Sequence, residues 1–141
     1  MTDVLTPSQR KFNMSRIRGR GTLPEMRVRL LIRRMGYRFR VYDIRLPGKP
    51  DLVIPSLSIA VFVHGCFWHM HRCRWGKVTP ATNSEFWASK RQGNVDRDRN
   101  VAAQFHRTRW KRIVVWECWT EEKLEMFLHC KFKQSELKIR R

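Results

Sequence analysis

The sequence predicts an α/β fold in which a β-sheet is covered by helices. Segments with helical spacing of apolar residues alternate along the chain with short apolar runs, and this order is typical of that fold class. The chain has 141 residues, of which 42% are hydrophobic. A chain of this length and composition can bury one core, so we expect a single compact domain.

The best-marked element is a helix that begins after Thr22 and ends near Gly36. Thr22 is a typical N-cap residue, Pro24 stands in the first turn, and Glu25 occupies the capping-box position. The other elements follow from apolar runs between turn residues. They are strands near residues 39–41, 51–54 and 58–63, a long helix over 84–107, a strand over 113–116 and a final helix over 121–129.

The chain divides into three parts by composition. We expect a basic N-terminal arm or short helix over residues 1–21, a single domain over residues 22–130, and a basic, frayed C-terminal tail over residues 131–141. Neither a signal-peptide core nor a membrane-spanning run is present in the sequence. We therefore expect a cytoplasmic protein without a membrane partner.

The charge of the chain favours nucleic acid as the partner. Lys and Arg number 30 against 12 Asp and Glu, which gives a formal net charge of +18. A field of this sign concentrates phosphate polyanions at the protein surface. A generally basic protein or a ribosomal-type scaffold would carry the same charge, so charge alone does not identify an enzyme.

A short segment, residues 61–73, combines three histidines, two cysteines and the adjacent aromatic residues Phe67 and Trp68. Within it and beyond, Cys66, His71, Cys73 and Cys118 provide a Cys₃His set of the kind that holds structural zinc. The alternative is that these thiols serve as small apolar side chains. A zinc ion would fix a glycine-containing loop that otherwise has little reason to be rigid.

Asp51 is the candidate ligand for a catalytic Mg²⁺. It stands where the turn 46–50 ends and a strand begins, and Mg²⁺ prefers hard oxygen ligands. An isolated Asp at such a place is more often an ordinary turn residue. The neighbouring strand shifts the balance, because it would bring the backbone carbonyl of Val63, together with His64 and His69, close to the same cation. Either imidazole could then act as a general base.

Aromatic residues accompany these ligands. Phe67 and Trp68 lie inside the segment, and Trp75 and Trp87 follow it. Large apolar side chains can wedge between base pairs, and the unstacking cost is lower at a mismatch, where pairing is already poor. Core packing is the alternative, and it is preferred for the tryptophans close to the predicted last strand.

Several motifs together resemble the very short patch repair DNA mismatch endonucleases. The most specific one is His64-Gly65-Cys66-Phe67-Trp68-His69 with His71 and Cys73. The others, in chain order, are Asn13-Met14-Ser15-Arg16-Ile17, Leu46-Pro47-Gly48-Lys49-Pro50-Asp51, Thr79-Pro80-Ala81-Thr82, Glu85-Phe86-Trp87, Asn94-Val95-Asp96-Arg97-Asp98-Arg99 and Val115-Trp116-Glu117-Cys118.

The resemblance implies a restriction-endonuclease-like core with a central mixed sheet and a Mg²⁺-dependent nick in one DNA strand. The nick would lie 5′ to the thymine of a T·G mismatch, the lesion left when 5-methylcytosine deaminates, and would initiate short-patch repair. The implied partner is double-stranded DNA that contains this mismatch. A monomer suffices for one asymmetric lesion, and a functional link to a cytosine-5 DNA methyltransferase and to other repair proteins is expected.

The resemblance also implies roles for single residues. Asp51 and the Val63 carbonyl would hold Mg²⁺, His69 would be the general base oriented by Glu25, and His64 with Asp98 would support the scissile phosphate and the leaving group. The zinc ligands would be Cys66, His71, Cys73 and Cys118. The implied DNA contacts are Phe67, Trp68 and Trp87 from the major groove, Met14 with Asn13 and Ile17 from the minor groove, and Lys90 and Asn94 near the mispaired bases.

Two positions depart from the family pattern. Val63 stands where threonine is common, which preserves a carbonyl ligand but removes any hydroxyl contact, and Met70 replaces a histidine of some relatives. Two other function classes remain open: a restriction-type endonuclease that cuts intact duplex DNA, and a noncatalytic zinc-dependent DNA-binding protein.

Overall fold

The computed structural model describes residues 21–140. The predicted basic arm and its residues Asn13, Met14 and Ile17 lie outside this part of the chain. The described elements are α2 (Leu23–Arg34), β1 (Arg40–Val41), β2 (Leu52–Ile54), a 3₁₀ turn (Pro55–Leu57), β3 (Ile59–His64), α3 (Ser84–Phe105), β4 (Lys111–Trp116) and α4 (Glu121–Ile139). Their order and type agree with the sequence-based expectation.

The strands form a mixed four-stranded sheet in the order β1-β2-β3-β4. β1 and β2 pair antiparallel, as do β2 and β3, whereas β3 and β4 are parallel. Parallel strands need a long crossover, which the 65–83 loop and α3 provide. The register places His64 opposite Trp116, so the carboxyl ends of β3 and β4 lie side by side at one end of the sheet.

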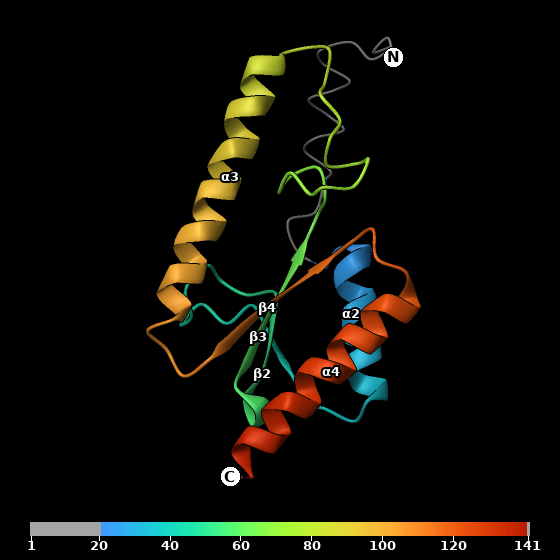
Figure 1. Ribbon diagram of the computed structural model, residues 1–141, viewed down its shortest axis with the longest axis vertical. Coiled ribbons are helices and arrows are strands. Elements are labelled where there is room, and N and C mark those ends of the chain that lie inside the picture. The colour runs from blue at the N-terminus through green and yellow to red at the C-terminus, as the bar shows by residue number, and fades with distance from the viewer. Residues whose placement is uncertain (1–20, 141) are drawn as a thin grey trace.

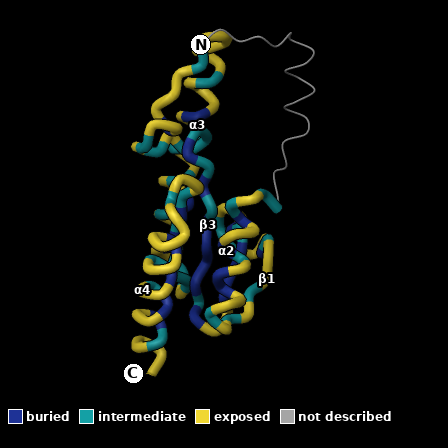
Figure 2. Tube along the Cα trace, turned by 90° about the vertical axis from the view of Figure 1, so that its right-hand side faces the viewer, coloured by how far each residue is buried: buried dark blue, intermediate teal, exposed yellow. Residues whose placement is uncertain are grey.

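Helices cover the two faces of this sheet unequally. Figure 1 shows α2 and α4 together on one side and α3 on the other. The α2/α4 face holds a large apolar core to which β2, β3 and β4 contribute Leu52, Val61 and Val115. On the α3 face a smaller cluster comprises Val53, Ala60, Phe62, Val101 and Phe105. Figure 2 shows that β3 is buried along nearly its whole length.

Helix α2 begins as its sequence predicts. The hydroxyl of Thr22 accepts a hydrogen bond from the Glu25 amide at 3.4 Å, and Pro24 occupies the first turn, where its missing N–H costs nothing. Val28 and Ile32 then point into the core. None of the helices within residues 21–140 is long and apolar enough to cross a membrane.

Helix α4 differs from the prediction at its C-terminal end. The helix does not stop near His129 but continues to Ile139, so residues 131–139 are not a frayed tail. Phe132 is fully buried and Ser135 nearly so, and they extend the inward-facing series of Leu124 and Leu128 by two further turns. The apolar face of the helix therefore holds the basic segment in place.

Candidate functional site

A cleft opens where the carboxyl ends of β3 and β4 meet the start of β2. Its volume is about 680 Å³. The residues that line it come from α2, the turn before β2, β3, the 65–83 loop, α3, β4 and the turn after β4, and those with carboxylate or imidazole side chains are Glu25, Asp51, His64, His69, Asp98 and Glu117. The Val63 backbone and Trp68 also contribute to its walls. The fold thus gathers five predicted catalytic residues, which are far apart in the sequence, into one open site.

Asp51 lies at the start of β2, against the end of β3. Its Oδ2 accepts a hydrogen bond from the Val63 amide at 2.7 Å. Burial raises the pKa of Asp51 to about 6, although the hydrogen bond from Val63 acts to lower it. A partly buried carboxylate whose charge is poorly compensated is a favourable ligand for a divalent cation.

His69 forms a close pair with Asp98 of α3. The distance between Nδ1 of His69 and Oδ2 of Asp98 is 2.6 Å, and the other oxygen of Asp98 lies 3.9 Å from Nε2 of His64. The two imidazole rings are stacked, with centroids 3.8 Å apart. Burial lowers the pKa of His64 to about 3, and neighbouring His69 adds to the effect. Burial acts to raise the pKa of Asp98, but the hydrogen bond with His69 and the charges of the histidines lower it overall.

Glu25, the residue predicted to orient His69, makes its contacts in the described part of the chain with other groups. Its side chain is buried, and its Oε2 accepts hydrogen bonds from the Gly21 amide at 3.0 Å and from the hydroxyl of Tyr42 at 2.9 Å. Arg29, one turn along α2, pairs with the same oxygen at 3.3 Å. These contacts hold the carboxylate at the start of α2. Asp98 is the carboxylate that contacts His69, because α3 packs along the loop that carries this histidine.

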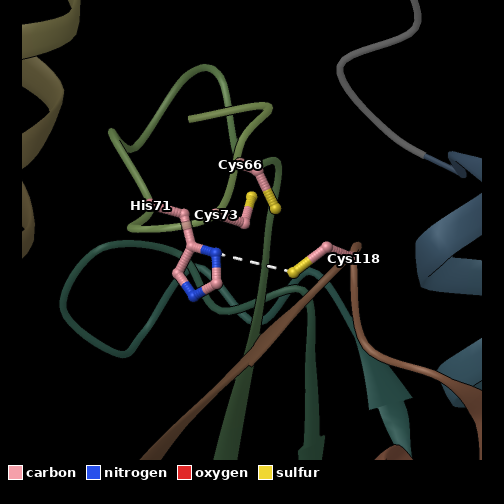
Figure 3. A group of neighbouring side chains, drawn as sticks. All are labelled: Cys66, His71, Cys73 and Cys118. Atoms are coloured by element: carbon pink, nitrogen blue, oxygen red, sulfur yellow. Dashed lines mark hydrogen bonds between the residues drawn. The ribbon is translucent and has the colours of Figure 1, made fainter. Parts of the chain in front are cut away.

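The four predicted zinc ligands converge on one point (Figure 3). The sulfur atoms of Cys66, Cys73 and Cys118 and a nitrogen of His71 all lie within 4.8 Å of one another. Nδ1 of His71 is 3.5 Å from the Cys118 sulfur. Three ligands come from the 65–83 loop and the fourth follows β4, so a bound ion would tie the loop to the sheet. A closed Cys₃His set suits tetrahedral zinc.

The cysteine cluster has uneven proton affinities. Burial raises the pKa of the Cys66 thiol to about 12. Burial also acts to raise the pKa of Cys73, but hydrogen bonds from His71 and backbone groups outweigh it and lower the pKa to about 6. Zinc binding requires thiolates and displaces these protons.

Glu117 is a site residue that the sequence did not single out. Its Oε1 accepts a hydrogen bond from the Cys66 amide at 2.8 Å, and its own amide donates to the His64 carbonyl at 3.1 Å. Glu117 therefore fixes the turn between the end of β3 and the cysteine cluster. Its place between Trp116 and Cys118, directly after the predicted strand, is the signal that could have indicated it.

The predicted wedge residues form one aromatic group beside the cleft. Ring centroids of Phe67 and Trp68 lie 5.3 Å apart, and Trp87 of α3 lies 5.8 Å and 5.7 Å from these two rings. Phe86, which is 58% exposed, adjoins Trp87 at 5.2 Å and extends the group. The ammonium of Lys90 lies 5.5 Å from the Trp68 ring. A partly exposed aromatic group with a cation beside it is suited to stacking on bases.

These features define a class of protein. A cleft that combines an acidic residue with an Asp-paired histidine, next to partly exposed aromatic residues in a strongly basic chain, is the site of an endonuclease that acts on DNA. Comparison with known proteins agrees. A model of the family described as DNA mismatch endonuclease Vsr matches residues 2–75.

The relatives make the membership specific. The chain is 43% identical over 118 residues to DNA mismatch endonuclease Vsr of Escherichia coli K12, covering 84% of this chain and 75% of the relative. It is equally similar, at 43% over 118 residues, to type II nicking enzyme V.XorIIP of Xanthomonas oryzae pv. oryzae, with 84% and 86% of the two chains covered. Type II nicking enzyme V.NmeAIP of Neisseria meningitidis is 42% identical over 118 residues, 84% of each chain. The chain belongs to the DNA mismatch endonuclease Vsr family.

Proposed function

We propose that this protein nicks one strand of duplex DNA on the 5′ side of the thymine in a T·G mismatch and so initiates very short patch repair. The observation that supports this most directly is the position of the aromatic group next to the cleft that holds Asp51 and the His69–Asp98 pair. A wedge that opens a mismatch there would present the adjoining phosphate to the acidic and imidazole groups.

Mg²⁺ is the proposed catalytic cofactor, with the Asp51 carboxylate and the Val63 carbonyl as its protein ligands. The fit is supported by the raised pKa of Asp51 and by the open cleft in front of it, which leaves room for water and phosphate oxygens. A bound Mg²⁺ would polarise the phosphate and stabilise the negative charge that develops on it.

The chain's own residues would move the proton. Because Nδ1 of His69 faces the Asp98 carboxylate, Nδ1 carries the hydrogen and Nε2 is left as a proton acceptor for the attacking water. Asp98 stabilises the imidazolium that forms. His64, whose low pKa keeps it neutral near pH 7, would orient the scissile phosphate by hydrogen bonding rather than by charge.

The remaining parts would support this chemistry. Zinc held by the cysteine cluster would make the loop that bears the wedge rigid, and the mixed sheet with its helices would be a restriction-endonuclease-like core. Lys90 and Asn94 would lie near the mispaired bases, with the arm around Met14 on the minor-groove side. We expect a cytoplasmic monomer that works beside a cytosine-5 DNA methyltransferase.

A strand-resolved nicking assay tests the proposal. Duplexes labelled separately on each strand, with a T·G mismatch or with full pairing, are incubated with the protein with and without Mg²⁺. We expect one nick, on the thymine strand, only with the mismatch and only with Mg²⁺. Faster cleavage of paired DNA would favour a restriction-type endonuclease, and tight binding without a nick would favour a noncatalytic DNA-binding protein.

The zinc proposal has its own test with a matched cysteine control. Metal analysis of the purified chain should find about one zinc per molecule, as a closed four-ligand set implies. Cys118→Ser should lose the metal and destabilise the loop. Cys130→Ser, which changes an exposed cysteine on α4 away from the cluster, should retain it. Equal zinc in both variants would disprove the ligand assignment.

A further inference from the structure

Arg91 on α3 occupies an unusual place for an arginine. It is only 5% exposed, and burial lowers its pKa without any compensating carboxylate among the described residues. A buried guanidinium is costly unless its donors are satisfied. Neither the proposed chemistry nor the proposed DNA contacts use this residue.

The guanidinium of Arg91 is satisfied by the loop instead. Its Nε donates to the Phe67 carbonyl at 2.6 Å, one terminal nitrogen donates to the Val78 carbonyl at 2.8 Å, and the other donates to the Gly76 carbonyl. The charge also lies 4.4 Å from the centre of the Phe67 ring. Only arginine offers a rigid planar fork with donors in three directions, so lysine could not reproduce this contact.

Two of the three carbonyls that Arg91 binds stand at critical points of the loop. Phe67 belongs to the aromatic group, and Gly76 passes so close to His71 that an added Cβ would come within 1.9 Å of the His71 carbonyl oxygen. By binding the carbonyls of Phe67 and Gly76, Arg91 links the aromatic group to the segment that packs on His71 of the cysteine cluster.

Two other residues of α3 continue the same contact. The side-chain amide of Asn94 donates to the Trp68 carbonyl at 3.0 Å, and Asp98 pairs with His69. Arg91, Asn94 and Asp98 share one face of the helix because they are spaced by three and four positions. They meet the consecutive loop residues Phe67, Trp68 and His69 in the same order, so helix and loop run side by side.

We infer that Arg91 is a positioning residue that sets the aromatic wedge relative to His69. The inference rests on the proposed function, in which the aromatic group inserts at the mismatch as a wedge. Zinc would fix the loop to β4, and Arg91 fixes it to α3. The aromatic group that would insert at the mismatch and the imidazole of His69 that would accept the proton are then held in a fixed position relative to each other. Without the fork the loop keeps its proposed zinc ligands and its contacts with Asn94 and Asp98, but its carbonyls at Phe67 and Gly76 are no longer held against the helix.

The test compares Arg91→Lys with Arg107→Lys in the full, zinc-loaded chain. Both variants retain the charge, and Arg107 is exposed just beyond the end of α3. A T·G duplex with 2-aminopurine beside the mismatch is titrated without Mg²⁺, because unstacking by the wedge raises the fluorescence of this base. We expect Arg91→Lys to lose at least half of the rise at saturation and to lower kcat for nicking about 10-fold, with KM nearly unchanged. Arg107→Lys should match the wild type.

A double-mutant cycle separates positioning from general structural support. If Arg91 acts through the wedge, Arg91→Lys should add little to the loss of kcat caused by Phe67→Ala, since both changes impair insertion of the wedge at the mismatch. Losses that multiply, or a full fluorescence rise in Arg91→Lys, would overturn the inference. Zinc content and circular dichroism of the variants verify the fold.

A measurement on the unaltered protein covers the case in which Arg91→Lys fails to fold. The Nε proton of Arg91 should exchange slowly in the free enzyme, and slowly again in the T·G complex, whereas that of Arg107 should exchange fast. Fast exchange at Arg91 in either state would refute the inference. Absence of nicking by the wild type would refute the proposed function alone, because the exchange measurement does not depend on cleavage.

Discussion

The two faces of the sheet divide stability from chemistry. The face under α2 and α4 is closed by large side chains such as Ile32, Leu128 and Phe132, all fully buried. The face under α3 has a small apolar cluster, and beyond it His64, Asp98 and Arg112 surround a cleft. His64 buries a ring nitrogen with no hydrogen-bond partner among the described residues, and such groups reduce stability. The buried core under α2 and α4 thus provides the stability that offsets the cost of the unpartnered polar group under α3.

Strand β3 contributes side chains to both faces of the sheet. Ile59 and Val61 face α2 and α4, whereas Ala60 and Phe62 face α3, as the alternation of a strand requires. His64 continues the α3-facing series at the last position of the strand. One strand therefore contributes to the core on one side and to the reactive site on the other.

The largest expected effect is on the chemistry of the α3 face. Asp51→Asn should lower kcat for T·G nicking about 1000-fold, or ~4 kcal/mol, because a neutral amide is a poor Mg²⁺ ligand. Asp96→Asn is the matched control, since Asp96 is exposed on α3 and hydrogen bonds only with Gln92 among the described residues. Single-turnover kinetics measure both. A wild-type rate for Asp51→Asn would remove this residue from the metal site.

On the opposite face the effect should fall on stability alone. Phe132→Ala should lower the free energy of unfolding by about 3–5 kcal/mol, because it leaves a cavity in the α2/α4 core. Leu137→Ala, on the exposed side of the same helix, should change it by less than about 0.5 kcal/mol. Denaturant unfolding gives these values. If Phe132→Ala also lowered the nicking rate of the folded fraction, the separation of the two faces would be incomplete.

A smaller effect is expected from the partner of the proposed base. Asp98→Asn should lower kcat about 10- to 100-fold, since the amide can hold His69 but no longer stabilises its protonated form. The unfolding free energy should change little, because Asp98 is partly exposed in the cleft. The result to look for is a kcat loss with a nearly constant KM, and an unchanged kcat would exclude the His69–Asp98 pair from proton transfer.

The smallest effect concerns the stability cost of Asp51. Its pKa is raised in the folded state to about 6. Above that pH the carboxylate is charged in both states, but its charge is buried in the folded protein and hydrated in the unfolded chain, which lowers the stability of the folded protein. Without added Mg²⁺, Asp51→Asn should therefore raise stability by about 1–3 kcal/mol at pH 7.5, and the gain should vanish as the pH falls from 6 to 4.

Asp43 gives the opposite sign and serves as a control. Hydrogen bonds from Arg45 lower the pKa of Asp43 to about 2, so Asp43→Asn should lose stability near neutral pH, and the loss should shrink as the pH approaches 2. Thermal unfolding across pH measures both. A stability gain for Asp51→Asn that persisted at pH 4 would mean that the effect does not arise from the carboxylate charge.

Local patterns in the sequence predicted what depends on local chemistry. Thr22 and Glu25 marked the start of α2, and the spacing of Cys66, His71 and Cys73 indicated a shared site that the structure brings together. The end of α4 was missed because the basic residues after Lys131 hid the inward spacing of Phe132 and Ser135.

Pairings across the fold were out of reach of the sequence. His69 and Asp98 meet only because α3 lies along the 65–83 loop, and nothing near either residue selects Asp98 over Glu25 as the partner. In the sequence Arg91 does not differ from the many other basic residues, and only its burial in the structure distinguishes it. Its spacing from Asn94 and Asp98 on a predicted helix was the available signal.

The parallel pairing of β3 with β4 sets the order in which the site is completed during synthesis. Asp51, His64, His69 and Asp98 all leave the ribosome before β4 does. Glu117, which holds the Cys66 amide, and Cys118, the last member of the cysteine cluster, directly follow β4. A chain that stalls before this strand carries its reactive side chains but lacks Glu117 and Cys118, which complete the turn after β3 and the cysteine cluster. A half-made copy of the chain therefore has no complete cysteine cluster to tie the 65–83 loop to the sheet.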